Sequence, residues 1–386
     1  MIYFDNAATT AIKPKEVGES VSNVLVSGLY GNPGRDSSEF SVNSGVVVNQ
    51  TRDKLVKLFN VPSNDLVTFT TNVTESLNTV LKGILREGDH VITTDYEHNS
   101  VLRPLAQLKE KRNVDVDYVT FDKETGLLCV EDFEKYLKPN TKAVVCNNAS
   151  NVTGYVLPIK QISGFCQKHD LLLIVDAAQT AGVEDIDIQR DKIDVLCFTG
   201  HKSLYGPQGI GGICFRKPIE IEPLKSGGTG IDSFNTSMPK FFPTRLEAGT
   251  MNVPGIVGLS AGIDYVNKKG IDNIKNYING LVSRIMETLQ QYPEIKIYTP
   301  FNAEITGTVG FNIGDIDSAE VGQWLWDNYQ IATRPGAHCA PRVHERYGTV
   351  EQGIVRISLS SFNKDEEVDT FLKAIKEFMD IYRRGL

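Results

Sequence analysis

Seven short apolar runs alternate with longer segments of helical periodicity through most of the first 260 residues of this 386-residue chain. Such alternation is typical of parallel strands, which are buried on both faces and are joined by helical crossovers. The sequence therefore predicts an α/β fold with a mainly parallel seven-stranded sheet. The strands are expected at 66–69, 90–93, 116–119, 143–146, 171–175, 195–198 and 212–215.

One helix is expected between the first two strands. Leu77, Val80, Leu81, Ile84 and Leu85 recur at the spacing of a helix with one buried face, and the helix should begin near 72–74.

A second unit follows a change in composition around 216–250, where glycines and prolines interrupt the pattern. We predict a large domain at 15–256 and a small α+β domain formed by 1–14 and 257–386. Within the small domain we expect helical structure at 257–292, strands at 309–313 and 354–358, and a closing amphipathic helix that includes 368–379.

Charge and hydropathy limit the partners of the chain. The formal net charge is -8, and acidic and basic residues are interspersed, so no basic stripe suits nucleic acid. The first five residues stop being apolar too soon for a signal-peptide core, and no apolar run reaches membrane-spanning length. We expect a cytoplasmic protein that binds neither nucleic acid nor a membrane.

The six cysteines, at 129, 146, 166, 197, 214 and 339, have no spacing of the zinc-binding type and indicate neither a metal site nor a disulfide framework. The first five have apolar neighbours and are expected to be buried. Cys339 lies instead in a basic segment rich in turn-forming residues, 334–342. It is predicted to be a loop cysteine.

Polar residues that follow the strands should meet at one edge of the sheet, beyond the carboxyl ends of the strands. Residues 70–75 open a helix, where free N–H groups suit a phosphate, although ordinary helix capping accounts for the same residues. His98 could lie against an aromatic ligand or be merely solvated. Asp176 ends a buried strand, where a carboxylate needs a cation such as a protonated pyridine nitrogen, unless it caps a helix.

Lys202 follows the strand at 195–198 by a single turn. Most lysines lie on the surface, but a lysine partly removed from water has a lowered pKa and can form a Schiff base with an aldehyde. Phosphate, pyridinium, aromatic ring and aldehyde are the groups that pyridoxal 5'-phosphate presents. The combined pattern therefore predicts this cofactor.

With these residues the chain resembles the class V aminotransferases, and among them the cysteine desulfurases, over essentially its whole length. The segment around Cys339 is compact, as in the second desulfurase group, which is related to selenocysteine lyase. The motifs that carry the resemblance are 3–10, 31–33, 97–99, 150–154, 175–179, 200–202, 247–250 and 334–340.

The resemblance implies a fold type I, aspartate aminotransferase-like fold and a set of cofactor contacts. Lys202 would hold pyridoxal phosphate, Asp176 would pair with the ring nitrogen, and His98 would stack on the ring. Further implied contacts are Gln179 at the ring hydroxyl, Val73, Thr74, Thr199 and His201 at the phosphate, Asn151 beside cofactor and substrate, and Thr250 at the phosphate of a neighbouring subunit.

The implied reaction converts L-cysteine to L-alanine and leaves the sulfur as a persulfide on Cys339. Lys202 would take the α-proton, and Arg356 would bind the substrate carboxylate with help from Asn151 and Arg334. Cationic neighbours would favour the thiolate form of Cys339, and three residues near it in sequence could supply such a charge: Arg334, His338 and Arg342.

The implied partners are a second copy of the chain, in a homodimer with shared active sites, and a sulfur-acceptor protein. The destination of the sulfur, of which iron–sulfur cluster assembly is one, stays open. Two departures from the family pattern concern Val73, where relatives often have Gly or Thr, and 31–36, which lacks a histidine common there.

Two other interpretations remain. The chain could be a selenocysteine lyase or another class V enzyme in which Cys339 is incidental. It could also be a non-catalytic regulatory or binding protein of the same fold, although the presence of Lys202 and Asp176 argues against that.

Overall fold

The predicted seven-stranded sheet is present in the computed structural model, which describes residues 1–33 and 38–385. The strand order is β2-β8-β7-β6-β5-β3-β4, and only β8 runs antiparallel to its neighbours. The mainly parallel α/β fold is thereby confirmed. The strands are β2 Val67–Thr70, β3 His90–Thr94, β4 Asp115–Val119, β5 Thr141–Asn147, β6 Leu172–Asp176, β7 Val195–Thr199 and β8 Gly211–Phe215.

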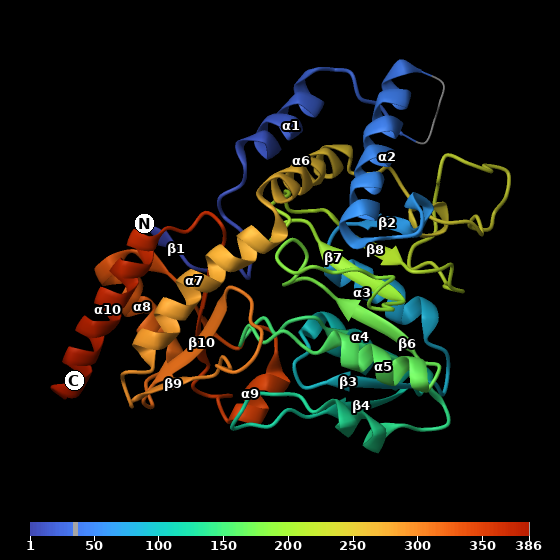
Figure 1. Ribbon diagram of the computed structural model, residues 1–386. Coiled ribbons are helices and arrows are strands. Elements are labelled where there is room, and N and C mark those ends of the chain that lie inside the picture. The colour runs from blue at the N-terminus through green and yellow to red at the C-terminus, as the bar shows by residue number, and fades with distance from the viewer. Residues whose placement is uncertain (34–37, 386) are drawn as a thin grey trace.

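Helices pack on this sheet and on one another (Figure 1). The expected helix between the first two strands is α3, which packs against β7 and β8. Helix α4 packs against β4 and α5 against β6, while α1, α2 and α6 form a group of their own. Their bounds are α1 Lys15–Val26, α2 Glu39–Phe59, α3 Val73–Ile84, α4 Asn99–Arg112, α5 Ile159–Lys168 and α6 Val253–Lys269.

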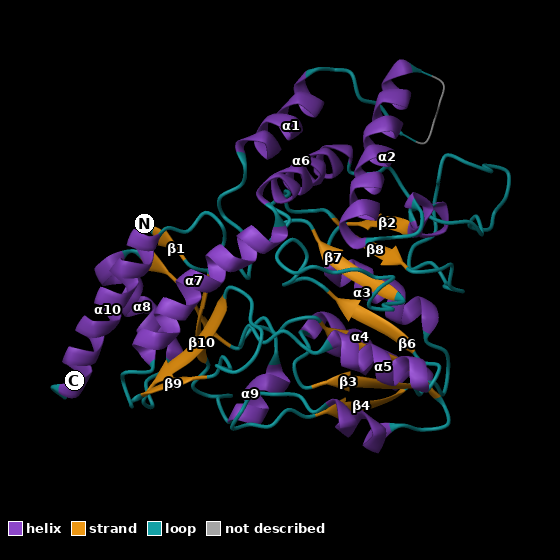
Figure 2. Cartoon of the chain, in the orientation of Figure 1, coloured by secondary structure: helices purple, strands orange, loops and turns teal. Residues whose placement is uncertain are grey.

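The second unit is built on a four-stranded antiparallel sheet of order β12-β13-β10-β9, with helices beside it (Figure 2). The N-terminal strand β1 joins this unit by pairing in parallel with β11. The elements are β1 Ile2–Tyr3, α7 Ile271–Leu289, β9 Ile295–Ile297, β10 Thr308–Ile313, α8 Ser318–Tyr329, β11 Ile331–Ala332, β12 Arg334–Gly336, α9 Pro341–Tyr347, β13 Ile354–Ser358 and α10 Asp365–Arg383.

One hydrophobic cluster surrounds the seven-stranded sheet, and a second contains most of the buried residues of the four-stranded sheet. The helical stretch expected at 257–292 is divided into α6 and α7 at Gly270, whose φ of 83° is a backbone conformation that suits glycine. The expected boundary between 256 and 257 falls inside α6, a helix that packs on α1 and α2. The domain limits stay a prediction.

Four of the five cysteines expected to be buried are buried, and Cys129 is exposed. The prediction for Cys129 was wrong because its neighbour Leu128 takes the inward position, while Cys129 precedes a short 3₁₀ helix, Val130–Tyr136, and its thiol contacts Glu131. Apolar neighbours in sequence did not indicate which side chain faces inward.

Among the described residues, no helix combines the length and the apolar character needed to cross a bilayer. Helix α2, for example, has 21 residues but carries Arg52, Asp53, Lys54 and Lys57.

Candidate active site

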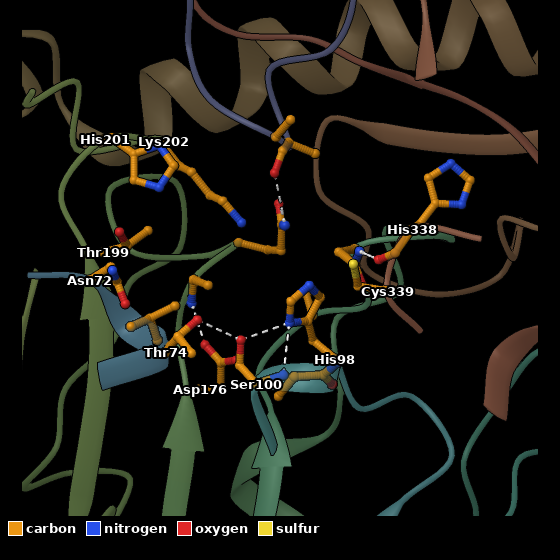
Figure 3. Close-up of a pocket in the computed structure, with 18 of the residues that line it drawn as sticks. Asn72, Thr74, His98, Ser100, Asp176, Thr199, His201, Lys202, His338 and Cys339 are labelled. Carbon is orange, nitrogen blue, oxygen red and sulfur yellow. Dashed lines mark hydrogen bonds between the residues drawn. The ribbon is translucent and has the colours of Figure 1, made fainter. Parts of the chain in front are cut away.

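A cavity of about 320 Å³ lies where β5, β6 and β7 end, and residues of β12 and β13 line it as well. It brings together every predicted site residue except Thr250 (Figure 3). The predicted residues that line it are Val73, Thr74, His98, Asn151, Asp176, Gln179, Thr199, His201, Lys202, Arg334, Cys339 and Arg356.

One end of the cavity has unused hydrogen-bonding capacity. It lies at the N-terminus of α3, where Asn72 caps the helix by accepting a hydrogen bond from the N–H of Glu75 at 2.9 Å. The Oγ1 of Thr199 is buried there and has no partner among the described residues. A helix N-terminus with a free hydroxyl beside it is suited to bind an anion.

Asp176 lies at the end of β6 with only 4 % of its surface exposed. Its Oδ1 accepts a hydrogen bond from the N–H of Ala178 at 2.9 Å, and it has no ion-pair partner within the described residues. Burial raises its pKa to about 6, although the hydrogen bond from Ala178 and the charge of Lys202 act in the opposite direction. A buried carboxylate of this kind is stabilised by a cation that enters the cavity.

Lys202 follows β7 and points its amine into the cavity (Figure 3). Burial lowers the pKa of this amine to about 8, and the attraction of Asp176 works in the opposite direction. A substantial fraction of the amine is therefore neutral near physiological pH, and a neutral amine can act as a nucleophile or a base.

His98 is held as an uncharged ring at the N-terminus of α4. Its Nδ1 accepts a hydrogen bond from the N–H of Ser100 at 3.0 Å, so its proton is assigned to Nε2. Burial, with a smaller effect of the charge of Lys202, lowers its pKa to about 4. Ser100 also links His98 to the α3 end of the cavity, because its Oγ lies 2.8 Å from Thr74 Oγ1.

Arg356 reaches the cavity from β13 and is only 2 % exposed. One terminal nitrogen donates to Asp5 Oδ1 at 2.5 Å and the other to the carbonyl of Asn151 at 3.0 Å. Its Nε has no partner among the described residues. The guanidinium can therefore bind a further carboxylate.

Cys339 is exposed, and it lies in the loop between β12 and α9 at the opposite end of the cavity from α3 (Figure 3). Of the three cationic neighbours considered for it, His338 is neutral because burial lowers its pKa to about 3. Arg342 is paired with Asp95 at 2.6 Å. Arg334 alone of the three lines the cavity as a cation.

Sequence reasoning missed several residues of this site. Asp5, the partner of Arg356, lies in the N-terminal motif 3–10 but was assigned no role of its own, and Ser100 follows the motif 97–99. Asn72 lies within the segment 70–75 that was predicted to suit a phosphate, but it was not assigned as the helix cap. Glu97, which adjoins His98, is buried outside the lining of the cavity, and burial raises its pKa to about 8. Adjacency to a singled-out residue was the available signal.

Thr250 lies elsewhere, on an exposed loop that borders two other hollows of the surface. In the segment 31–36, noted for its missing histidine, only 31–33 lies within the described residues, and Asn32 and Pro33 border one of these hollows.

The family model for Aminotransferase class-V matches residues 2–371 of the chain. This protein belongs to the class V aminotransferase family. A "Probable cysteine desulfurase" from Pyrococcus abyssi is 35% identical over 391 residues, which cover 99% of this class V chain and 95% of the relative. A "Cysteine desulfurase" from Salmonella agona is 31% identical over 384 residues, which cover 97% of this chain and 92% of that relative.

Solved structures agree with these sequence relationships. The apo structure of a cysteine desulfurase from Thermococcus onnurineus NA1 superposes with a TM-score of 0.91 at 32% identity, over 98% of this class V chain and 94% of that one. A cysteine desulfurase from Escherichia coli, described as an S-sulfonic acid, gives a TM-score of 0.87 at 26% identity over the same shares. The family consists of pyridoxal phosphate enzymes of fold type I.

Proposed function

We propose that this class V protein is a pyridoxal phosphate-dependent cysteine desulfurase that converts L-cysteine to L-alanine. The observation that carries the proposal is that the exposed thiol of Cys339 and the half-buried amine of Lys202 line one cavity. The names of the relatives from Pyrococcus abyssi and Salmonella agona support the same reaction.

The residues present fit pyridoxal phosphate. The α3 N-terminus and the unpartnered hydroxyl of Thr199 would receive the phosphate, with Thr74 and His201 beside it. The unpaired carboxylate of Asp176 would hold a ring cation, His98 would lie against the ring, and Gln179 and Asn151 would complete the contacts. When bound, the cofactor supplies an aldehyde for Lys202 and an electron sink for the substrate carbons.

The residues of the chain then have distinct tasks. Arg356 binds the carboxylate of cysteine through the donors that Asp5 and Asn151 leave free, with Arg334 at the same wall of the cavity. Lys202 Nζ, in its neutral form, accepts the α-proton.

Cys339 Sγ, as a thiolate, attacks the sulfur of the substrate, so that a sulfur–sulfur bond forms while the carbon–sulfur bond breaks. The electron pair of the broken bond stays with the carbon, which is protonated to give alanine. One cysteine and one thiolate thus yield one alanine and one persulfide on Cys339, and no external oxidant is required.

We further propose a cytoplasmic homodimer in which Thr250 serves the neighbouring subunit, and a sulfur-acceptor protein that removes the persulfide. The position of Thr250 on an exposed loop, outside the cavity of its own chain, supports the shared site.

Replacement of the thiol tests the proposal. In Cys339→Ala we expect the cofactor absorbance to persist, because the cofactor contacts lie at the other end of the cavity, and sulfide release from cysteine to fall to background. Cys129→Ala, which removes the other exposed thiol, should retain wild-type release. Release retained in Cys339→Ala would indicate another class V activity in which this cysteine is incidental.

A further inference from the structure

The turn that carries Cys339 has a backbone conformation that side chains disfavour. The φ angles are 106° at Gly336, 51° at His338 and 56° at Cys339. Residues other than glycine adopt positive φ rarely, and they keep it only where surrounding contacts hold the chain. The contacts that hold this turn therefore decide where the thiol lies.

Hydrogen bonds from the first residue of α4 and from the turn that follows β5 hold the backbone of the turn, together with one bond inside it. The carbonyl of Cys339 accepts from the N–H of Asn99 at 2.7 Å. The carbonyl of His338 accepts from Asn151 Nδ2 at 2.8 Å, and His338 Nε2 donates to the carbonyl of Arg334 at 3.0 Å.

Arg342, three residues after Cys339 in the first turn of α9, makes a further contact through its side chain. Arg342 Nε donates to Asp95 Oδ1 at 2.6 Å, and the guanidinium carbon lies 3.8 Å from the centroid of the Tyr118 ring. Asp95 is only 2 % exposed and follows β3 directly. It lies four residues before Asn99, so Cys339 and Arg342 are both attached to the segment 95–99.

Arg342 is poorly placed to act on the thiol by its charge. The carboxylate of Asp95 balances that charge at hydrogen-bonding distance, and the ring of Tyr118 covers the guanidinium face. The pair can still fix the position of α9, because a planar guanidinium between a buried acceptor and an aromatic ring has one preferred orientation.

We propose that Asp95 and Arg342 are positioning residues for Cys339: they fix the thiol at the mouth of the cavity and do not promote its ionisation. This inference rests on the proposed function, in which the Cys339 sulfur attacks the substrate sulfur. Loosening the pair should leave substrate and cofactor binding intact and misplace the nucleophile.

The test compares Arg342→Lys with the wild type, both carrying Cys129→Ala so that Cys339 is the exposed thiol that reacts. Lysine keeps the positive charge but loses the planar fork and the stacking on Tyr118. Two quantities are measured on the cofactor-loaded protein: the rate of Cys339 alkylation by iodoacetamide across pH, and the single-turnover rate of persulfide formation from cysteine. Arg346→Lys is the matched control, because Arg346 also lies in α9 and donates to the carbonyl of Phe121 at 2.8 Å.

We expect Arg342→Lys to raise the limiting alkylation rate several-fold without moving the midpoint of its pH profile, and to slow persulfide formation by about 100-fold, the usual cost of a misplaced reacting group. The cofactor absorbance and the KM for cysteine should not change. Arg346→Lys should behave as the wild type does.

Three results would overturn the inference: an alkylation profile identical to that of the wild type, a shifted midpoint with an unchanged limiting rate, or an equal effect of Arg346→Lys. Arg342→Gln is the second variant, and a midpoint shift in it that lysine restores would assign a charge role to Arg342. A wild-type protein that forms no persulfide would refute the proposed function instead, while the alkylation profiles would still decide the role of the pair.

Discussion

Burial sets the charge of the ionisable groups around the cavity. Loss of water lowers the pKa of His98 to about 4, that of His338 to about 3, and that of Lys202 to about 8. Near neutral pH the two rings are uncharged, whereas the amine exchanges readily between its two forms. The cavity therefore offers an aromatic surface and a base under the same conditions.

The neutral state of His338 predicts a pH dependence of stability. The unfolded chain binds a proton at this residue near its ordinary pKa of 6.5, but the folded chain does so only near 3, so acidification stabilises the unfolded state. Below about pH 6 this residue should reduce the free energy of unfolding by about 1.4 kcal/mol per pH unit. His338→Gln lacks this loss, so the difference in unfolding free energy between wild type and variant should shrink from pH 7 to pH 4 in urea titrations. A difference that is constant with pH would show that the ring is not held neutral.

The sequence predicted the site residues that follow strands. It did not predict side-chain pairings between residues that are distant along the chain. Asp176 was found because it directly follows an apolar run, and Lys202 because it follows another by a single turn. The pairing of Asp5 with Arg356 joins residues 351 positions apart, and nothing local indicates it. Proximity of Arg342 to Cys339 in sequence likewise did not reveal that its guanidinium is engaged by Asp95.

The strands and helices of the large sheet place these side chains at one of its edges. Strands β5, β6 and β7 run parallel, so their carboxyl ends meet, and α3 presents its N-terminus at the same edge. The capping residue Asn72 keeps the first turn of α3 in place. Asn72 thus helps to fix the helix end, together with Glu75, whose carboxylate accepts from the N–H of Thr71 at 2.7 Å.

Removal of that cap should weaken cofactor binding. Asn72→Ala loses the acceptor of the Glu75 N–H, which should lower the free energy of unfolding by about 1 kcal/mol. If the free energy of phosphate binding falls by the same amount, the affinity for the cofactor is roughly fivefold lower. The measurement is an absorbance titration of the apoprotein with pyridoxal phosphate. Asp317→Ala, which removes the cap of α8, should cost similar stability and leave the affinity unchanged. Equal affinities in wild type and Asn72→Ala would refute a role of the α3 terminus.

Strands with long apolar runs were predictable, and the short ones were not. Each of the seven runs became a strand of the large sheet, yet the antiparallel direction of β8 left no mark on its composition. Strands β1 and β11 have two residues each, and β12 contains Pro335, so their pairing partners and not their own sequences define them.

At the scale of the whole molecule, the seven-stranded and the four-stranded sheet together form the cavity. The large sheet supplies Asp176 and Lys202, whereas β12 and β13 supply Arg334 and Arg356, and Cys339 follows β12. The first and last elements, β1 and α10, lie in the unit of the four-stranded sheet (Figure 1). Periodicity along the sequence predicted the seven strands of the large sheet and two of the four strands of the other sheet, β10 and β13, but the contact between the two sheets depends on packing that no local pattern encodes.

The central claim is that the amine of Lys202 and the thiol of Cys339 act on one cysteine molecule. The direct measurement is the mass of the peptide that contains Cys339, together with alanine, after the cofactor-loaded protein reacts with L-cysteine in the absence of reductant. The account predicts one added sulfur atom on this peptide for each alanine formed, and neither product in Lys202→Ala. Alanine formed while Cys339 stays unmodified, or sulfur found on Cys129 instead, would contradict it.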